Sequence, residues 1–323
     1  MRNFVFLSLL VASLAVNANG DRHPEFPTYF ANSNGISIAY QDFGDPNDET
    51  VLLVMGLGAQ LIHWNDDFVM KLVDAGYRVI RFDNRDMGLS EKFYDEPTIG
   101  IITGIRYKLG LSLNAPYHLD DMAADGIGLL DHLEIDKAHI AGVSMGGMIA
   151  QIMAGNYPDR VLSLTSIMST SGAEHLPQGS LEIDTDSRDV ATREEGIQQM
   201  ITMRKAIYGK DAGLSEAEWY AKAARTYDRS HYADGFSRQF WAIVDSGDRV
   251  ELLKSINLPT LVIHGKIDPL IPLEHGEHTA ELVPGAKLVV LDEMGHTIGA
   301  EHQQDVLEPM LQLMQNASYA AEN

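Results

Sequence analysis

The chain has 323 residues, of which 45% are hydrophobic and 22% are charged, and these proportions are typical of a folded globular protein rather than a disordered or fibrous one. Acidic residues outnumber basic residues by 46 to 24, which gives a formal net charge of −22 and argues against a nucleic-acid partner. The chain has no cysteine, and this excludes disulfides, thiolate metal sites and a cysteine nucleophile.

The first eighteen residues have the three-part form of a secretory signal peptide. Met1-Arg2-Asn3 is a short positive start, an apolar run follows from Phe4 to Ala15, and Val16-Asn17-Ala18 places small residues before a cleavage point. The apolar run is too short to cross a bilayer as a stable helix. We therefore expect residues 1–18 to be removed after Ala18, leaving a secreted or periplasmic protein without stable membrane insertion. The alternative is an uncleaved anchor.

Strand and helix patterns alternate along most of the chain, which predicts an α/β fold. Alternating apolar residues predict an antiparallel lead-in strand over 33–41. Helical spacing predicts helices over 68–75, 118–133 and 145–156. Continuous apolar runs predict buried parallel strands over 51–55, 77–82, 138–143, 161–167, 261–264 and 287–291. The expected architecture is a mostly parallel central sheet flanked by helices.

This alternation fails between residues 173 and 250. The segment has no convincing strand, and it has helical patterns over 194–208, 215–226 and 235–246. It is too long to be a simple loop, so we predict a helical cap inserted into the core. The mature chain then divides into a first core part (19–172), the cap (173–250) and a second core part (251–323).

Gly142-Val143-Ser144-Met145-Gly146 lies between a predicted buried strand and a predicted helix. In this context the Gly-x-Ser-x-Gly pattern is typical of a nucleophile elbow, a tight turn that projects its serine at the carboxyl edge of a sheet. The flanking glycines leave room for the neighbouring strand and helix. We therefore predict that Ser144 is a catalytic nucleophile.

A serine hydroxyl needs a positioned base, and that base needs an acid to orient it. Asp268 follows the predicted strand over 261–264, and His296 follows the predicted strand over 287–291. Parallel strands bring their carboxyl ends to one edge of a sheet, so these residues should meet Ser144 there. We predict a Ser144–His296–Asp268 triad, with Asp292 as the alternative acid.

Two backbone N–H groups are needed to hold the oxyanion of a tetrahedral intermediate. Met145, directly after the nucleophile, is expected to supply one. Leu57, between Gly56 and Gly58 after the first buried strand, is expected to supply the other. The same glycines lack the remaining residues of a dinucleotide or P-loop motif. No ligand spacing for a catalytic zinc is present, so we predict no metal site.

Residues that contact the substrate are harder to assign from the sequence. His63 and Trp64 follow the predicted oxyanion loop closely and are candidates for substrate contact. Trp241, in the predicted cap, is a third candidate for lining an apolar pocket, although ordinary packing within the cap would explain it equally well.

The order of these motifs resembles that of α/β-hydrolase fold enzymes along nearly the whole mature chain. Many members of that superfamily have Asp-x-Arg-Gly-x-Gly-x-Ser, where this chain has Asp83-Asn84-Arg85-Asp86-Met87-Gly88-Leu89-Ser90. With Met55-Gly56 in place of the commoner His-Gly, this is similar to the aclacinomycin methylesterase-like branch. The resemblance implies a carboxylic ester hydrolase that uses no cofactor and acts on a small-molecule ester. It does not carry over the polyketide substrate.

The same triad also supports lactone opening, iminopeptide cleavage, C–C bond hydrolysis and perhydrolysis, so these remain alternatives to ester hydrolysis. An aspartyl nucleophile is disfavoured because Ser144 occupies the elbow. A protein that binds a small molecule in the same pocket without turnover is the alternative from another functional class.

Overall fold

A computed structural model describes residues 26–98, 106, 113–181 and 192–322. The predicted signal segment, residues 1–18, and its cleavage point after Ala18 lie outside the described residues. Within the described part of the chain, no helix combines the length and apolar character needed to cross a membrane.

The described residues form an eight-stranded sheet in the order β1-β2-β4-β3-β5-β6-β7-β8. Strands β1 and β2 pair antiparallel, as do β2 and β4, whereas every later pairing is parallel. The predicted mostly parallel sheet is confirmed. The strand bounds are β1 Tyr29–Ser33, β2 Ile36–Phe43, β3 Thr50–Val54, β4 Arg78–Phe82, β5 Ala138–Val143, β6 Val161–Ile167, β7 Thr260–Gly265 and β8 Lys287–Leu291.

The predicted lead-in strand over 33–41 is wrong at its beginning. Asn34 and Gly35 form a tight turn between β1 and β2, and both have positive φ angles, of 50° and 82°. Asn-Gly is the pair that a two-residue hairpin favours, because both central residues must adopt a left-handed conformation. The segment is therefore the end of one strand, a turn and the start of the next.

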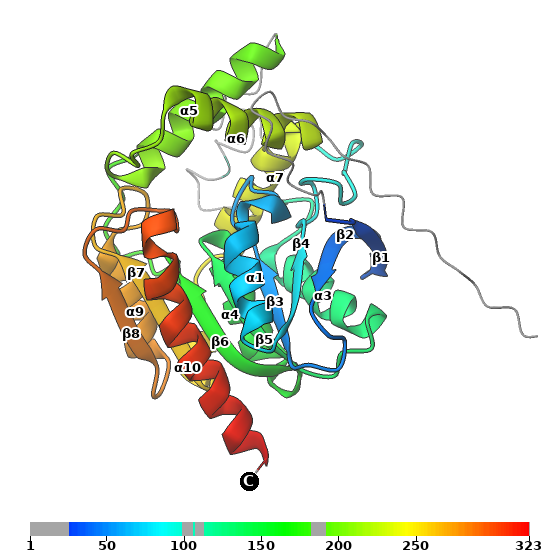
Figure 1. The fold of residues 1–323 in the computed structure, drawn as a ribbon, viewed down its shortest axis with the longest axis vertical. Helices are drawn as coiled ribbons and strands as arrows, with labels where there is room; N and C mark the ends of the chain where they lie inside the picture. Colours follow the sequence, from blue (N-terminus) through cyan, green and yellow to red (C-terminus); the bar gives the residue numbers. More distant parts are fainter. Residues whose placement is uncertain (1–25, 99–105, 107–112, 182–191, 323) are drawn as a thin grey trace, which may run out of the picture.

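Helices cover both faces of the sheet (Figure 1). One face carries α1 (Asp66–Asp74) and α10 (Gln303–Glu322), which pack against apolar side chains of β3, β5 and β7. The other face carries α3 (Leu119–His132), α4 (Met145–Asn156), α8 (Val250–Ser255) and α9 (Leu273–Leu282). The central strands β3, β4, β5 and β7 are buried along their whole length, which explains their continuous apolar runs. Short 3₁₀ helices occur at Leu61–His63, Pro158–Arg160 and Ala300–His302.

Three helices of the predicted insertion lie beyond the carboxyl ends of the strands, at the top of Figure 1. They are α5 (Arg193–Tyr208), α6 (Glu216–Arg229) and α7 (Ala233–Asp245). Thr192 and Ser215 begin α5 and α6 with capping boxes, in which the side chain and a glutamate three residues later satisfy free backbone N–H groups. Helices α5 and α6 pack on each other around Ile197, Ile201 and Trp219. We refer to α5–α7 as the cap.

The two ends of the cap insertion meet at one point of the core. The Arg249 N–H donates to the Ser171 carbonyl at 2.7 Å, and its guanidinium donates to the Thr170 carbonyl at 3.1 Å. The same guanidinium reaches Gln151 on α4 at 3.2 Å. Burial lowers the pKa of Arg249 to about 10. Arg249 therefore connects the segment that follows β6, where the chain enters the insertion, to the start of α8, where the chain returns to the core.

Candidate active site

Ser144 lies in a sharp turn directly between β5 and α4. Its φ of 55° and ψ of −123° are strained for a residue with a side chain, as the predicted elbow requires. A Cβ on Gly142 would lie 2.0 Å from the Gly146 carbonyl oxygen, and a Cβ on Gly146 would lie 2.2 Å from the Val54 carbonyl oxygen. Only glycine fits at either place, so the two glycines of the motif make the turn possible.

The structure brings the three predicted triad residues together. Ser144 Oγ lies 2.9 Å from His296 Nε2, and His296 Nδ1 lies 2.7 Å from Asp268 Oδ2. His296 and Asp268 are both 7% exposed, so water has little access to the hydrogen bond between them. In a neutral imidazole these contacts place the proton on Nδ1 and leave Nε2 as the acceptor. In this arrangement His296 can remove the proton of the serine hydroxyl.

Asp268, rather than Asp292, is the carboxylate that contacts the imidazole. The other oxygen of Asp268 accepts the N–H groups of Leu270 and Ile271 at 2.9 and 2.8 Å, which fixes the orientation of the carboxylate. Asp292 is exposed and pairs with Lys266 at 2.9 Å. The two acids that follow β7 and β8 therefore have different surroundings, and only Asp268 is placed to hold the histidine.

The predicted oxyanion loop lies against the elbow. A Cβ on Gly56 would stand 3.1 Å from Ser144 Cβ, so the loop after β3 approaches the serine closely. Among the described residues, neither the Leu57 N–H nor the Met145 N–H has a hydrogen-bond partner, which leaves both free to donate to a substrate oxygen. The next N–H along the loop, that of Gly58, donates instead to Gln239 Oε1 on α7 at 3.0 Å.

The loop that follows β4 joins the core to the cap through Asp86. This side chain is fully buried and accepts two hydrogen bonds from the Arg238 guanidinium of α7, at 2.8 and 3.1 Å. It also accepts the Tyr117 hydroxyl at 2.7 Å. Burial alone would lower the pKa of Arg238, but the hydrogen bonds and charge of Asp86 outweigh it and raise that pKa. Asp86 has a φ of 67°, a left-handed conformation that favours glycine.

A second cap residue holds the oxyanion loop and the loop after β4 together. Gln239 accepts the Gly58 N–H through its carbonyl oxygen and donates its amide to the Arg85 carbonyl at 2.8 Å. Arg85 in turn pairs with Asp125 of α3 at 2.6 Å. Gln239 and Arg238 have no signal in the sequence, because no local pattern marks contacts between residues so far apart in the chain.

The three predicted substrate contacts have different surroundings. Trp64 is 2% exposed, and its ring packs on Phe68 with the centroids 5.5 Å apart. It is therefore part of the hydrophobic core on the face of the sheet that carries α1. Trp241 is 8% exposed on α7. His63 is partly exposed and contacts Arg204 and Thr226 of the cap. Whether these residues touch a substrate stays a prediction.

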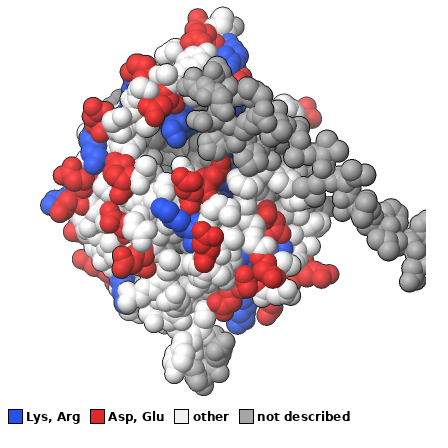
Figure 2. Space-filling view, in the orientation of Figure 1, with Lys and Arg blue, Asp and Glu red and all other residues white. Residues whose placement is uncertain are grey.

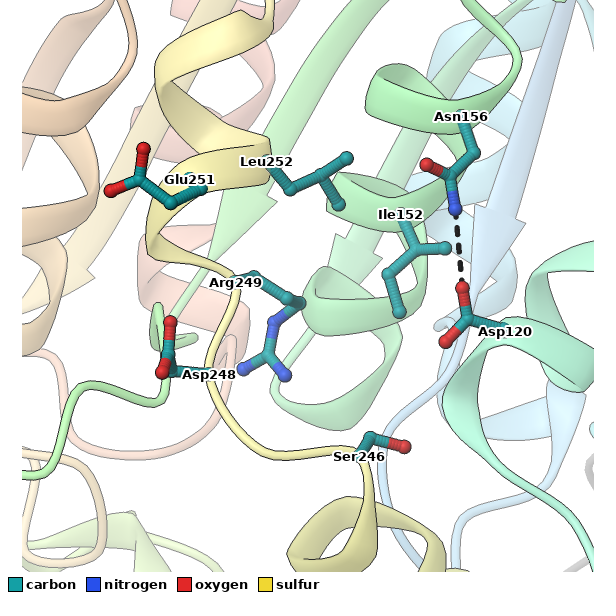
Figure 3. A pocket seen from close by; sticks show the side chains of 8 residues that line it. All are labelled: Asp120, Ile152, Asn156, Ser246, Asp248, Arg249, Glu251 and Leu252. Carbon is teal, nitrogen blue, oxygen red and sulfur yellow. Dashed lines mark hydrogen bonds between the residues drawn. The ribbon is translucent and has the colours of Figure 1, made fainter.

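A separate pocket of about 260 Å³ lies where the cap returns to the core (Figure 3). Its lining combines three carboxylates with the Arg249 side chain, and Asp120 is joined to Asn156 by a hydrogen bond of 3.1 Å. None of the predicted triad or oxyanion residues lines it. The pocket therefore belongs to the junction between cap and core rather than to the candidate active site.

Comparisons with known proteins point to one fold family. A family model described as alpha/beta hydrolase fold matches residues 49–303. The rhodomycin D methylesterase of Streptomyces peucetius is 27% identical, over 84% of this chain and 93% of the relative. The 3-oxoadipate enol-lactonase 2 of Acinetobacter baylyi is 25% identical, over 83% of this chain and 90% of the relative.

Solved structures show the same fold. The enol-lactonase of Burkholderia xenovorans LB400 superposes with a TM-score of 0.69 at 24% identity, covering 89% of this chain and all of that one. A meta-cleavage product hydrolase of Pseudomonas fluorescens superposes with a TM-score of 0.70 at 22% identity, covering 90% of this chain and 98% of that one. The predicted fold and the resemblance to the methylesterase-like branch are confirmed. The chain belongs to the alpha/beta hydrolase fold family.

Proposed function

We propose that this protein is a carboxylic ester hydrolase that works through an acyl-enzyme on Ser144. The observation that carries the proposal is the continuous hydrogen-bond chain from Ser144 through His296 to Asp268. The similarity to a methylesterase and to an enol-lactonase, which acts on a cyclic ester, supports ester chemistry over the other reactions that such a triad can perform.

The first half of the reaction forms the acyl-enzyme. Ser144 Oγ attacks the acyl carbon while His296 Nε2 accepts the hydroxyl proton, and Asp268 stabilises the imidazolium that forms. The Leu57 and Met145 N–H groups bind the oxyanion of the tetrahedral intermediate. His296 then returns the proton to the departing alcohol oxygen, and the C–O bond breaks to leave an ester between Ser144 and the acyl group.

Water completes the reaction by the same steps in reverse order. His296 removes a proton from water, the resulting hydroxide attacks the acyl carbon, and the second tetrahedral intermediate uses the same oxyanion donors. Proton return to Ser144 Oγ releases the carboxylic acid. Every proton transfer passes through His296. The reaction therefore balances with the ester, water and the residues of this chain alone.

Rates on simple esters test the proposal. The purified protein should hydrolyse p-nitrophenyl butyrate and methyl alkanoates, and Ser144→Ala should lower kcat by roughly 10⁴-fold or more, since the oxyanion hole and binding leave only residual catalysis. Ser255→Ala, which removes an exposed hydroxyl at the end of α8, is the matched control and should keep the full rate. A Ser144→Ala protein that retains the wild-type rate would contradict the mechanism.

We also propose that the protein is secreted or periplasmic, with cleavage after Ala18. The support is the three-part form of residues 1–18. Mass spectrometry of the protein recovered from its native host should give an N-terminus at Asn19. A chain that retains Met1 would mean that the segment is an anchor.

A further inference from the structure

Basic side chains gather next to the oxyanion loop, although the chain as a whole is strongly acidic. Figure 2 shows acidic side chains spread over much of the visible face. Around His63, in contrast, four basic residues of the cap impose positive charge: Lys222, Arg204, Arg225 and Arg229. Arg229 pairs with Asp83 at 2.8 Å and Arg225 with Asp66 at 3.6 Å. Within the described part of the chain, no carboxylate pairs with Arg204.

The hydrogen bonds of His63 show which of its ring nitrogens carries the proton. The Gln60 N–H donates to Nδ1 at 3.0 Å, so the neutral ring is protonated at Nε2. Burial lowers the pKa of His63 well below its ordinary value, and the charge of Arg204 lowers it further, so the ring is neutral at pH 7. Nε2–H therefore acts as a donor.

Two N–H donors thus converge on one side-chain oxygen. Nη2 of Arg204 and Nε2 of His63 each lie within hydrogen-bond distance of Thr226 Oγ1, at 3.2 and 3.1 Å. The Thr226 hydroxyl donates its own proton to the Lys222 carbonyl. The neutral Thr226 oxygen is therefore shared by two N–H donors, one of which belongs to the charged Arg204 guanidinium. Burial without a counter-charge lowers the pKa of Arg204 to about 10.

The helix that carries Arg204 contacts the loop that carries His296. The Ile207 carbonyl, near the end of α5, accepts the His296 N–H at 2.8 Å. Arg204 precedes Ile207 by nearly one helical turn, about 4.5 Å along the axis. His63 follows the oxyanion loop by a few residues. Both side chains are partly exposed. The pair therefore joins α5, which contacts the loop that carries His296, to the segment that follows the predicted oxyanion donors.

We propose that Arg204 and His63 bind a carboxylate group of the substrate. This inference rests on the proposed ester hydrolysis and narrows its substrates to esters or lactones that also carry a free carboxylate. A carboxylate accepts hydrogen bonds from both donors and supplies the missing counter-charge, and the planar guanidinium suits two parallel bonds to it. A neutral ester of the same length has no carboxylate and therefore forms no ion pair with Arg204.

Matched substrate pairs test the proposal on either side of the ester bond. Methyl half-esters of linear diacids are compared with methyl alkanoates of equal length, and 4-acetoxybutanoate is compared with butyl acetate. At least one charged substrate should exceed its neutral partner in kcat/KM by roughly 10-fold, the effect of one charge-assisted hydrogen bond. If the ratio of kcat/KM for the charged substrate to kcat/KM for its neutral partner is one or less for every pair, the proposed carboxylate site is overturned.

Substitution of the guanidinium separates a binding role from a structural one. Arg204→Gln should lower the charged-to-neutral ratio by roughly 10-fold, and Arg204→Lys should restore part of it. Arg193→Gln, which removes an exposed arginine from the same helix, is the control and should keep the wild-type ratio. If Arg204→Gln slows both substrates equally and leaves the ratio unchanged, Arg204 only supports the fold and the proposal fails.

Direct binding distinguishes failure of this inference from failure of the proposed function. Glutarate and adipate are titrated calorimetrically into Ser144→Ala, which cannot turn over an ester. Binding that weakens by roughly 10-fold when Arg204→Gln is added supports the site even if no tested ester is hydrolysed. If neither diacid binds, the carboxylate site is overturned, whereas the proposed ester hydrolysis is unaffected.

Discussion

The carboxyl edge of the sheet and the junction between cap and core are held by different kinds of contact. At the sheet edge, Ser144, Asp268 and His296 each follow a strand, and the carboxyl ends of neighbouring parallel strands bring them together. At the junction, buried side chains such as Asp86 and Arg238 reach across from elements that are far apart in the chain. The positions of the triad residues therefore depend on the strand ends, whereas the position of the cap depends on a few buried polar and charged side chains.

The largest effect on activity should come from the sheet edge. Asp268→Asn should lower kcat on the order of 10⁴-fold, because an amide favours the wrong histidine tautomer. The folded protein should otherwise remain intact, since the amide is close in size to the carboxylate. Turnover of a p-nitrophenyl ester measures the change.

Asp292→Asn is the matched control for this substitution. Asp292 also follows a strand of the same sheet, but it is exposed and contacts Lys266 rather than His296. Its rate should stay close to that of the wild type. A larger loss in Asp292→Asn than in Asp268→Asn would move the triad acid to Asp292.

The largest effect on stability should come from the junction. Asp86→Asn leaves the Arg238 guanidinium buried without its counter-charge, which typically costs about 3–5 kcal/mol. Urea unfolding monitored by circular dichroism measures this loss. The catalytic hydrogen bonds do not involve Asp86, so stability should fall far more than the rate measured on the remaining folded protein.

An exposed ion pair of similar geometry provides the comparison for Asp86. Arg193 and Asp228 also form two hydrogen bonds, both at 2.6 Å, but about half of each side chain is exposed. Water screens such a pair, so Asp228→Asn should leave the unfolding midpoint nearly unchanged. Equal losses in the two variants would mean that burial of the Asp86 pair does not hold the cap.

A smaller effect should appear in the pH dependence of stability. The pKa of His63 is lower in the folded protein than in the unfolded chain, because of burial and the nearby charge of Arg204. Below the ordinary pKa of about 6.5, the unfolded chain therefore binds a proton that the folded protein excludes. The contribution of His63 to stability is complete above this pH and is lost as the pH falls.

Comparison with His63→Gln isolates this group from the other titrating residues. The unfolding free energy of the wild type, relative to His63→Gln, should decrease between pH 7 and pH 5. The measurement is made at constant ionic strength, so that the screening of the acidic surface does not change. A difference that stays constant or increases toward pH 5 would contradict a depressed pKa.

The same division separates what the sequence could predict from what it could not. The sheet, the elbow at Ser144 and the positions of Asp268 and His296 follow from local patterns, because strand, turn and helix signals lie within a few residues of each group. The hairpin at Asn34-Gly35 was also readable, since that pair is typical of a tight turn. Apolar residues alternate on both sides of it, and this continuous alternation is also typical of a single strand.

Contacts across the junction left little local signal. Asp86 was visible as a departure from a common glycine, but its partner Arg238 lies 152 residues away, and no periodicity links the two. The pairing of His63 with Arg204 is equally distant in the chain and depends on how α5 and α6 lie over the core. Such contacts follow from tertiary packing, which one sequence does not encode in a short pattern.

The most direct test of the account is covalent labelling of the elbow serine. The native protein is treated with a fluorophosphonate, digested and analysed by mass spectrometry, with His296→Ala treated in parallel. We predict one phosphonylated site at Ser144 in the native protein and a strong reduction in the variant, because the reaction needs a serine activated by the imidazole. A native protein that remains unlabelled at Ser144, or equal labelling of the two proteins, would contradict the triad.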